Sequence, residues 1–242
     1  MVSDIWRMVM KLYREPLDIE ILDNQLLVNG KEHQHSIRTI DHMGEVLQHP
    51  AKDHNALYYM YRAVHQYKTL RYDITHLTAN LIGDEYTKTY GHYHPAAPDG
   101  VVYPETYHVL SGNALFLLQK KNPDGIEVIS VNAKEKETVI FPPGYGHVSI
   151  NPTNKDLVLA NIVSNSFESD YSDYKKYRGA AYYYTTNGFI ENKNYKIKKF
   201  EQLNADEINK RFEFSSKDLL LEFYRDPDKF EFLERPGIKF RN

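Results

Sequence analysis

Two stretches of the sequence decide the fold: GHYHPAAPDGVVYPETYHVLSG at residues 91–112 and PPGYGHVSIN at residues 142–151. In an extended strand, side chains two residues apart point to the same side, so the two histidines of GHYH face one interior point. A neighbouring strand would add a glutamate, and the end of a later hairpin would add a third histidine. Three imidazoles and one carboxylate suit Fe, Mn, Ni or Zn and leave coordination positions open for substrate oxygens. The sequence therefore predicts one divalent metal ion per chain, with the ligands His92, His94, Glu105 and His147.

A second His-x-His pair, His33 and His35, shows why spacing alone is weak evidence for a metal site. This pair follows the turn residues Asn29-Gly30, and no matched cluster of ligands comes after it. We interpret these two as surface histidines with a structural role. The pair at His92 and His94 differs because a glutamate and a Pro-x-Gly-x-x-His motif both follow in order.

The residues around these motifs indicate an all-β fold. Apolar and polar residues alternate with period two from about residue 17, as in the run Leu70-Arg71-Tyr72-Asp73-Ile74. Clusters of Gly, Pro, Asn and Asp separate short strand-like runs, which favours an antiparallel sandwich or barrel over a βαβ fold. The later expected strands are 107–110, 114–118, 126–131, 138–141 and 157–163.

The pattern changes towards the end of the chain, where helical spacing replaces alternation. Asn204 and Glu207 resemble a capping box that opens a helix, and Ser215 is expected to open a second one. We therefore divide the chain into a barrel with N-terminal strands at 1–190 and a mostly helical extension at 191–242, packed on the barrel.

Composition limits the remaining classes of function. The 242 residues carry a formal net charge of -3, which argues against nucleic-acid binding and against electrostatic binding to an anionic membrane. The absence of cysteine excludes disulfides and thiolate ligands. No apolar run approaches the ~18 residues of a membrane span, and charges interrupt residues 1–15, so we expect no secretory signal and a cytoplasmic location.

The neighbours of the expected ligands outline a pocket. Tyr107 has the same parity as Glu105 and should point inward, whereas Thr106 and His108 should point outward, making His108 a packing residue. Thr75 and the run Thr87–Gly91 offer hydroxyls, the Lys88 ammonium and a flexible backbone N–H that could hold a phosphate or sugar hydroxyls.

The Pro142-x-Gly144-x-x-His147-x-x-x-Asn151 motif and the spacing from Glu105 to Gly112 resemble the cupin superfamily. The runs Thr89–His94, Glu105–Gly112 and Phe141–His147 resemble in more detail the cupin-type (archaeal-type) glucose-6-phosphate isomerases. Gly83-Asp84-Glu85, Leu115–Gln119, Arg38–Met43 and Tyr58–Tyr61 extend the likeness over residues 15–190. The resemblance implies a double-stranded β-helix, or jelly-roll-like, cupin barrel.

The same resemblance implies an aldose–ketose isomerase of glycolysis and gluconeogenesis that interconverts glucose 6-phosphate and fructose 6-phosphate as a homodimer. Its metal ligands fall on the four residues named above, with iron among the suitable metals. Val163 and Ser169 stand where the family carries a pocket tyrosine and a histidine, and the loop from His94 to Glu105 is longer than usual. The implied substrate-binding positions are Thr75, Thr89, Gly91, Tyr107, Tyr58 and Tyr171.

Several alternatives stay open at the level of the sequence. Glu105 is the best-placed candidate for a catalytic base, but a hydride shift on an open-chain sugar would need no base. Other metal-dependent cupin enzymes, such as a dioxygenase or another sugar isomerase, fit the same ligands. A non-catalytic sugar-binding cupin fits them as well.

Overall fold

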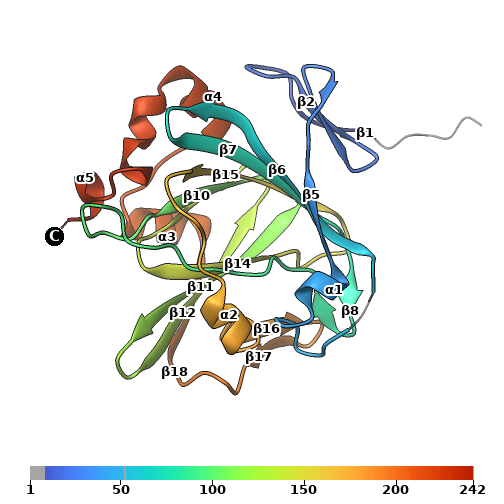
Figure 1. Ribbon diagram of the computed structural model, residues 1–242, viewed down its shortest axis with the longest axis vertical. Helices are drawn as coiled ribbons and strands as arrows, with labels where there is room; N and C mark the ends of the chain where they lie inside the picture. Colours follow the sequence, from blue (N-terminus) through green and yellow to red (C-terminus); the bar gives the residue numbers. More distant parts are fainter. Residues whose placement is uncertain (1–8, 52, 242) are drawn as a thin grey trace, which may run out of the picture.

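The computed structural model describes residues 9–51 and 53–241, in which antiparallel strands predominate (Figure 1). Two sheets form the barrel, and buried apolar side chains from both contribute to one core between them. The expected all-β barrel is confirmed. The larger sheet has the strand order β13 (Thr138–Phe141), β10 (Glu105–Ser111), β15 (Leu157–Ser164), β7 (Leu70–Leu77), β6 (Ala56–Tyr67) and β5 (Ser36–Thr39).

The second barrel sheet and two smaller sheets complete the β-structure. Among the described residues, every pair of strands is antiparallel except β12 with β18, which run parallel. The second barrel sheet has the order β14 (Tyr145–Ile150), β11 (Asn113–Asn122), β12 (Gly125–Lys134) and β18 (Ile197–Asn204). The small sheets are β1 (Val9–Tyr13), β2 (Ile19–Leu22), β3 (Gln25–Val28) and β4 (Lys31–Glu32), and β17 (Gly188–Glu191), β16 (Tyr182–Thr185), β9 (Glu85–Tyr86) and β8 (Leu81–Ile82).

Strand β7 shows how alternation positions the pocket. Tyr72 and Ile74 are fully buried in a second core on the outer face of the larger sheet. The alternate residues, including Arg71 and Thr75, line the pocket inside the barrel. Both faces of this strand are therefore covered, the outer one by the N-terminal strands and the C-terminal helices. In Figure 1 those helices (red) pack beside β6, β7 and β15.

The helices are short and mostly C-terminal. The capping box at α3 is confirmed, because Asn204 Oδ1 accepts from Glu207 N at 3.0 Å and Glu207 Oε2 accepts from Asn204 N at 2.8 Å. Ser215 does not open α4. Asp218 does, because its carboxylate accepts from Leu221 N at 3.0 Å. The helices are α1 (Ile40–Met43), α2 (Ser172–Lys176), α3 (Ala205–Arg211), α4 (Leu219–Arg225), the 3₁₀ helix η1 (Pro227–Leu233) and α5 (Gly237–Phe240).

The tail after residue 190 is helical only in part. Residues 197–204 form β18 on the edge of a barrel sheet, so the helices begin at Ala205. The division into 1–190 and 191–242 stays a prediction. The first eight residues of the segment expected to lack a secretory signal lie outside the described residues. No helix in the described part of the chain is long and apolar enough to cross a membrane.

Candidate metal centre

The histidine-bearing segment is held in place by single bridges between strands. His92 N donates to His147 O at 3.3 Å and His147 N donates to His92 O at 3.0 Å, while Tyr93 pairs with Asp170. The segment is therefore extended, and its alternate residues His92 and His94 point to the same side as expected. Gly91 precedes them with φ +86°, and a Cβ there would lie 2.4 Å from the ring of Tyr174, so only glycine fits.

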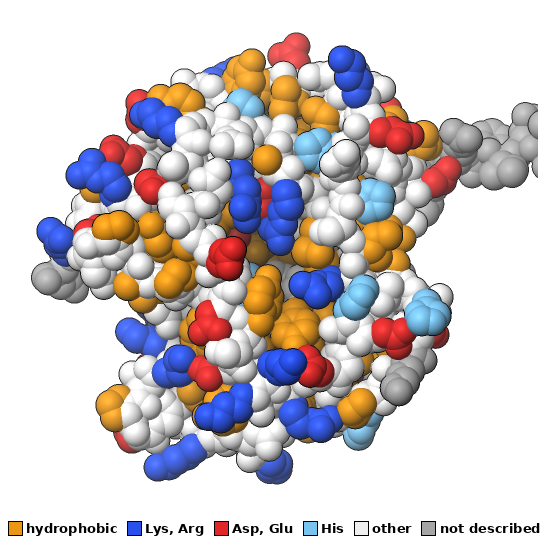
Figure 2. All heavy atoms as spheres, viewed as in Figure 1, with side chains coloured by type: hydrophobic (Ala, Val, Ile, Leu, Met, Phe, Trp, Pro, Cys, Tyr) orange, Lys and Arg blue, Asp and Glu red, His pale blue; other side chains and the backbone are white. Residues whose placement is uncertain are grey.

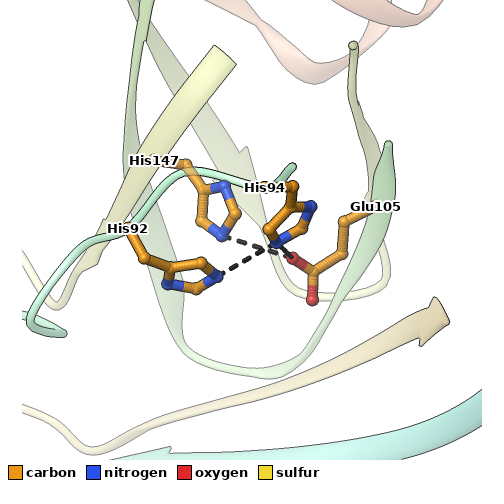
Figure 3. A group of neighbouring side chains, drawn as sticks. All are labelled: His92, His94, Glu105 and His147. Carbon is orange, nitrogen blue, oxygen red and sulfur yellow. Dashed lines mark hydrogen bonds and ion pairs between the residues drawn. The ribbon is translucent and has the colours of Figure 1, made fainter. Parts of the chain in front are cut away.

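The four predicted ligands converge on one point (Figure 3). One ligand atom from each residue can be chosen so that all four lie within 4.8 Å of one another. His92 Nε2 is 3.1 Å from His94 Nε2, and Glu105 Oε2 is 3.2 Å from His147 Nε2 and 3.5 Å from His94 Nε2. Ligands ~2.0–2.2 Å from a shared ion lie at most ~4.4 Å apart. The group therefore approaches the spacing that a single divalent cation requires.

Two of the polar atoms that face the centre of this group are left without a hydrogen-bond partner. Among the described residues, buried Glu105 Oε2 and His147 Nε2 make no hydrogen bond, although their separation qualifies as an ion pair. Buried polar atoms without a partner are costly, and a bound cation removes that cost for both atoms at once. The donor set of three imidazoles and one carboxylate suits a divalent transition metal. The residues present therefore fit a metal ion.

Surrounding residues fix the orientation of the ligands. Asn161 Nδ2 donates to Glu105 Oε1 at 2.7 Å, leaving the other carboxylate oxygen to face the histidines. His94 Nδ1 lies 3.0 Å from Tyr103 O, which directs Nε2 towards the centre. Such outer contacts set ring orientation and tautomer in metal sites. Asn161 lies in a strand that the sequence predicts, but no motif singles it out.

Burial of the centre favours the uncharged forms of His92 and His94 in the metal-free protein. Burial lowers the pKa of His94 from 6.5 to about 4. Burial also lowers the pKa of His92 well below 6.5, and nearby His147 and His94 lower it further. Burial alone would raise the pKa of Glu105, but His147, His94 and Arg62 together outweigh it and lower the pKa below 4.5. Neutral imidazoles and an ionised carboxylate are the forms that bind metals.

The residues implied as substrate contacts all line the pocket that contains the four ligands. Thr89 Oγ1 accepts from Ser149 N at 3.0 Å and can still donate its own proton. Tyr171 is 36% exposed and stands at the rim, its ring centroid 5.4 Å from that of His92. The structure thus brings into one pocket Thr75, Thr89, Gly91, Tyr107, Tyr58 and Tyr171.

Two other candidates lie apart from this pocket. The Lys88 ammonium, considered above as a ligand contact, is buried and donates to Glu85 and to Val46 O, so it is already paired. His108 points away from the centre, as expected, with Nδ1 3.3 Å from the Tyr13 hydroxyl.

Sequence reasoning missed two arginines in the pocket wall. Arg62 and Arg71 line the pocket together with Val163, Phe167 and Ser169. The parity of Arg71 with Thr75 on one strand is the signal that could have found it.

The antiparallel barrel and the convergent ligand group define the chain as a cupin with a candidate mononuclear metal centre. A family model described as glucose-6-phosphate isomerase (GPI) matches residues 49–200. The chain therefore belongs to the cupin-type glucose-6-phosphate isomerase family. Curated protein sequences give no significant match.

Several solved structures match parts of the chain at low identity. Oxalate oxidase in complex with the substrate analogue glycolate matches at 16% identity and TM-score 0.32, over 39% of this chain and 41% of that chain. Lactobacillus farciminis oxalate decarboxylase matches at 16% identity and TM-score 0.36, over 47% and 30%. A cupin-2 domain protein from Shewanella frigidimarina matches at 12% identity and TM-score 0.30, over 43% and 78%. The matched region spans less than half of either oxalate enzyme.

Proposed function

We propose that the protein is a metal-dependent aldose–ketose isomerase that interconverts glucose 6-phosphate and fructose 6-phosphate. The observation that carries the proposal is the convergence of four metal-binding side chains inside a pocket lined by hydroxyl groups. The family match over residues 49–200 supports the same activity.

The pocket offers different groups for the two ends of such a substrate. The hydroxyls of Thr75 and Thr89 and the backbone at Gly91 would bind the phosphate, as hydrogen-bond donors near one end of the pocket. That contact positions the distant reacting carbons. A bound divalent metal would supply Lewis-acid polarisation of the sugar carbonyl.

Tyr107 lines the pocket and would lie next to the reacting carbons, with Phe141 packed against its ring. Burial raises the pKa of Tyr107 well above 10, so its hydroxyl keeps its proton and can donate to a sugar oxygen. Its ring stacks on Phe141 with centroids 4.4 Å apart, which fixes the direction of the hydroxyl. Tyr171 at the rim would cover bound substrate and limit the entry of water.

The role of Glu105 decides between proton transfer and a hydride shift. One oxygen accepts from Asn161 and the other faces the histidines, while the pKa is lowered. Both features favour a role as a metal ligand and make the carboxylate a weak base. The Glu105→Gln variant, assayed at saturating metal, should therefore keep turnover within about tenfold of wild type. A base contributes about 10²- to 10⁴-fold, so a larger loss with metal still bound would assign proton transfer to Glu105.

The test of the proposed function is metal analysis followed by an isomerase assay. The purified protein should contain about one divalent ion per chain, lose activity with a chelator and regain it when metal is added back. The assay is run anaerobically, so that oxygen-dependent chemistry cannot contribute. Metal-replete protein that converts neither sugar phosphate, or that consumes oxygen with another substrate, would contradict the proposal.

The expected homodimer is part of the proposal, and light scattering of the purified protein checks it. A mass of twice 28.4 kDa would support a dimer. A mass of 28.4 kDa would contradict it.

A further inference from the structure

The wall of the pocket contains a pair of arginines whose positive charge is only half balanced. Arg62 Nη1 and Arg71 Nε both donate to Asp73 Oδ2 at 2.8 Å, and Ala63 N donates to Asp73 Oδ1 at 2.7 Å. Asp73 is fully buried, so it holds both guanidinium groups in fixed positions. One carboxylate faces two permanent cations, so Arg62, Arg71 and Asp73 together carry a net charge of about +1, while the nearby Glu105 carboxylate is directed at the histidines.

The arginines retain hydrogen-bond donors for a ligand. Arg71 uses only Nε in bonds to the described residues, so its two Nη groups are free to donate. Arg62 Nη2 contacts only the sulfur of Met60, at 3.5 Å, which is a weak acceptor. Planar guanidinium groups with free donors are well suited to phosphate and carboxylate oxygens. Figure 2 shows basic side chains beside a hollow near the middle of this face.

Strand register places the arginine pair between Glu105 and Thr75. Val163 pairs with Arg71, and Thr106 pairs with Ile162, so the backbone of Arg71 lies in one row with Val163 and Glu105. Both guanidinium groups are bonded to Asp73, which lies two residues, or roughly 7 Å along the strand, from Thr75. The guanidinium groups are therefore a separate set of donors, displaced along β7 from the Thr75 hydroxyl.

We propose that Arg62 and Arg71 form a second anion-binding subsite, which takes a phosphate or carboxylate group at the end of a sugar phosphate opposite its first phosphate. The ligand class is a doubly anionic sugar derivative, such as a hexose bisphosphate or an aldonic acid phosphate. The placement of the first phosphate at Thr75 and Thr89 rests on the proposed function.

Binding of two probes to the metal-loaded protein tests the subsite by calorimetry. Fructose 6-phosphate has one phosphate, and fructose 1,6-bisphosphate has a second one on C1, which prevents its conversion to an aldose. Charge-assisted hydrogen bonds to the second phosphate should make the bisphosphate bind about 10- to 100-fold more tightly. Equal affinity for the two probes would overturn the proposal without the need for any variant.

The Arg71→Gln variant locates the subsite. Asp73 keeps its bonds to Arg62 and Ala63 in this variant, so no buried carboxylate is left unpaired. The preference for the bisphosphate should fall to within about twofold, through a loss of bisphosphate affinity that is larger than any change in fructose 6-phosphate affinity. The matched control Arg225→Gln, at an exposed arginine on α4, should keep the full preference. A preference that survives in Arg71→Gln would overturn the assignment.

The binding assay and the isomerase assay together distinguish failure of the arginine subsite from failure of the proposed function. Isomerase activity without a preference for the bisphosphate removes the subsite and leaves the proposed function standing. Conversely, a preference that depends on Arg71 in a protein without isomerase activity supports the subsite and contradicts the proposed reaction.

Discussion

Two His-x-His pairs occur in this chain, and their surroundings differ in every respect that matters for metal binding. His92 and His94 lie inside the barrel, where Glu105 and His147 complete a group of four ligands. His33 and His35 lie near the N-terminal sheet and outside this group, where His33 is half-buried and His35 is exposed.

The outer pair, His33 and His35, makes other contacts. His33 Nε2 lies 2.8 Å from Arg62 O, and the ring of His35 packs against Tyr59 and Tyr61 at 5.6 and 5.5 Å. The same spacing therefore produces a metal centre only where the fold supplies further ligands and excludes water. Convergence of side chains from distant strands, and not the local motif, therefore creates the candidate metal site.

Removal of a distant ligand should have the largest effect. The His147→Asn variant loses the ligand contributed by β14, so its metal content should fall. The isomerase rate should drop at least about 100-fold, which is more than is usual for residues that only hydrogen-bond to a metal ligand. Metal analysis and steady-state kinetics measure both quantities. Full activity with normal metal content would show that three ligands suffice and would contradict a need for all four side chains.

Removal of the residue that orients Glu105 should have a smaller effect. Asn161→Ala deletes the donor to Glu105 Oε1, and metal affinity should fall about 10- to 100-fold while saturating metal restores most of the activity. Competition with a fluorescent chelator gives the affinity. The control Asn132→Ala, at an exposed position on β12, should leave affinity unchanged. An unchanged value in Asn161→Ala would show that Glu105 needs no support from β15.

Acid should destabilise the metal-free protein because His94, one of the two histidines inside the barrel, is buried in its uncharged form. Unfolded His94 takes up a proton near pH 6.5, whereas the folded residue does so only at about 4. The unfolded state therefore binds more protons between these values, and stability present above pH 6.5 is lost as the pH falls towards 4. The slope from His94 is about 1.4 kcal/mol per pH unit. Urea unfolding after chelation measures it, and a flat profile across this interval in the metal-free protein would contradict the burial of neutral histidines.

Changes at the outer pair should have the smallest effect. The double variant His33→Gln, His35→Gln should change the free energy of unfolding by about 0.5 kcal/mol or less, as is usual for surface sites. Metal content and isomerase rate should match wild type. If metal content falls in this variant, the outer histidines participate in binding and the contrast between the pairs is lost.

The barrel was predictable because its strands carry simple local signals. Alternation and turn residues located β7, β13 and β15 closely, and the Asn204–Glu207 pair located the start of α3. The prediction that Ser215 opens the next helix is wrong because Asp218, three residues later, caps that helix. The sheet strand at 197–204 was missed because its polar residues resemble a solvated segment.

The candidate site was predictable only in part. The ligands were predictable because a His-x-His pair, a glutamate and a Pro-x-Gly-x-x-His motif follow one another in order, which together indicate His92, His94, Glu105 and His147. Alternation on β7 does not by itself reveal which face is the pocket, because both faces are covered in the folded chain. The parity of Arg71 with Thr75 therefore indicates the pocket only if Thr75 lines it, and Asn161 carried no signal until the strand register was known.

The central claim is that one divalent cation binds among the four inner side chains. Anomalous X-ray scattering from a crystal of the metal-loaded protein, recorded at the absorption edge of the metal, tests it most directly. We expect a single strong peak in the anomalous difference map. It should lie ~2.0–2.2 Å from the ligand nitrogens of His92, His94 and His147 and from a carboxylate oxygen of Glu105. A peak at the outer histidines, or none at the inner group, would contradict it.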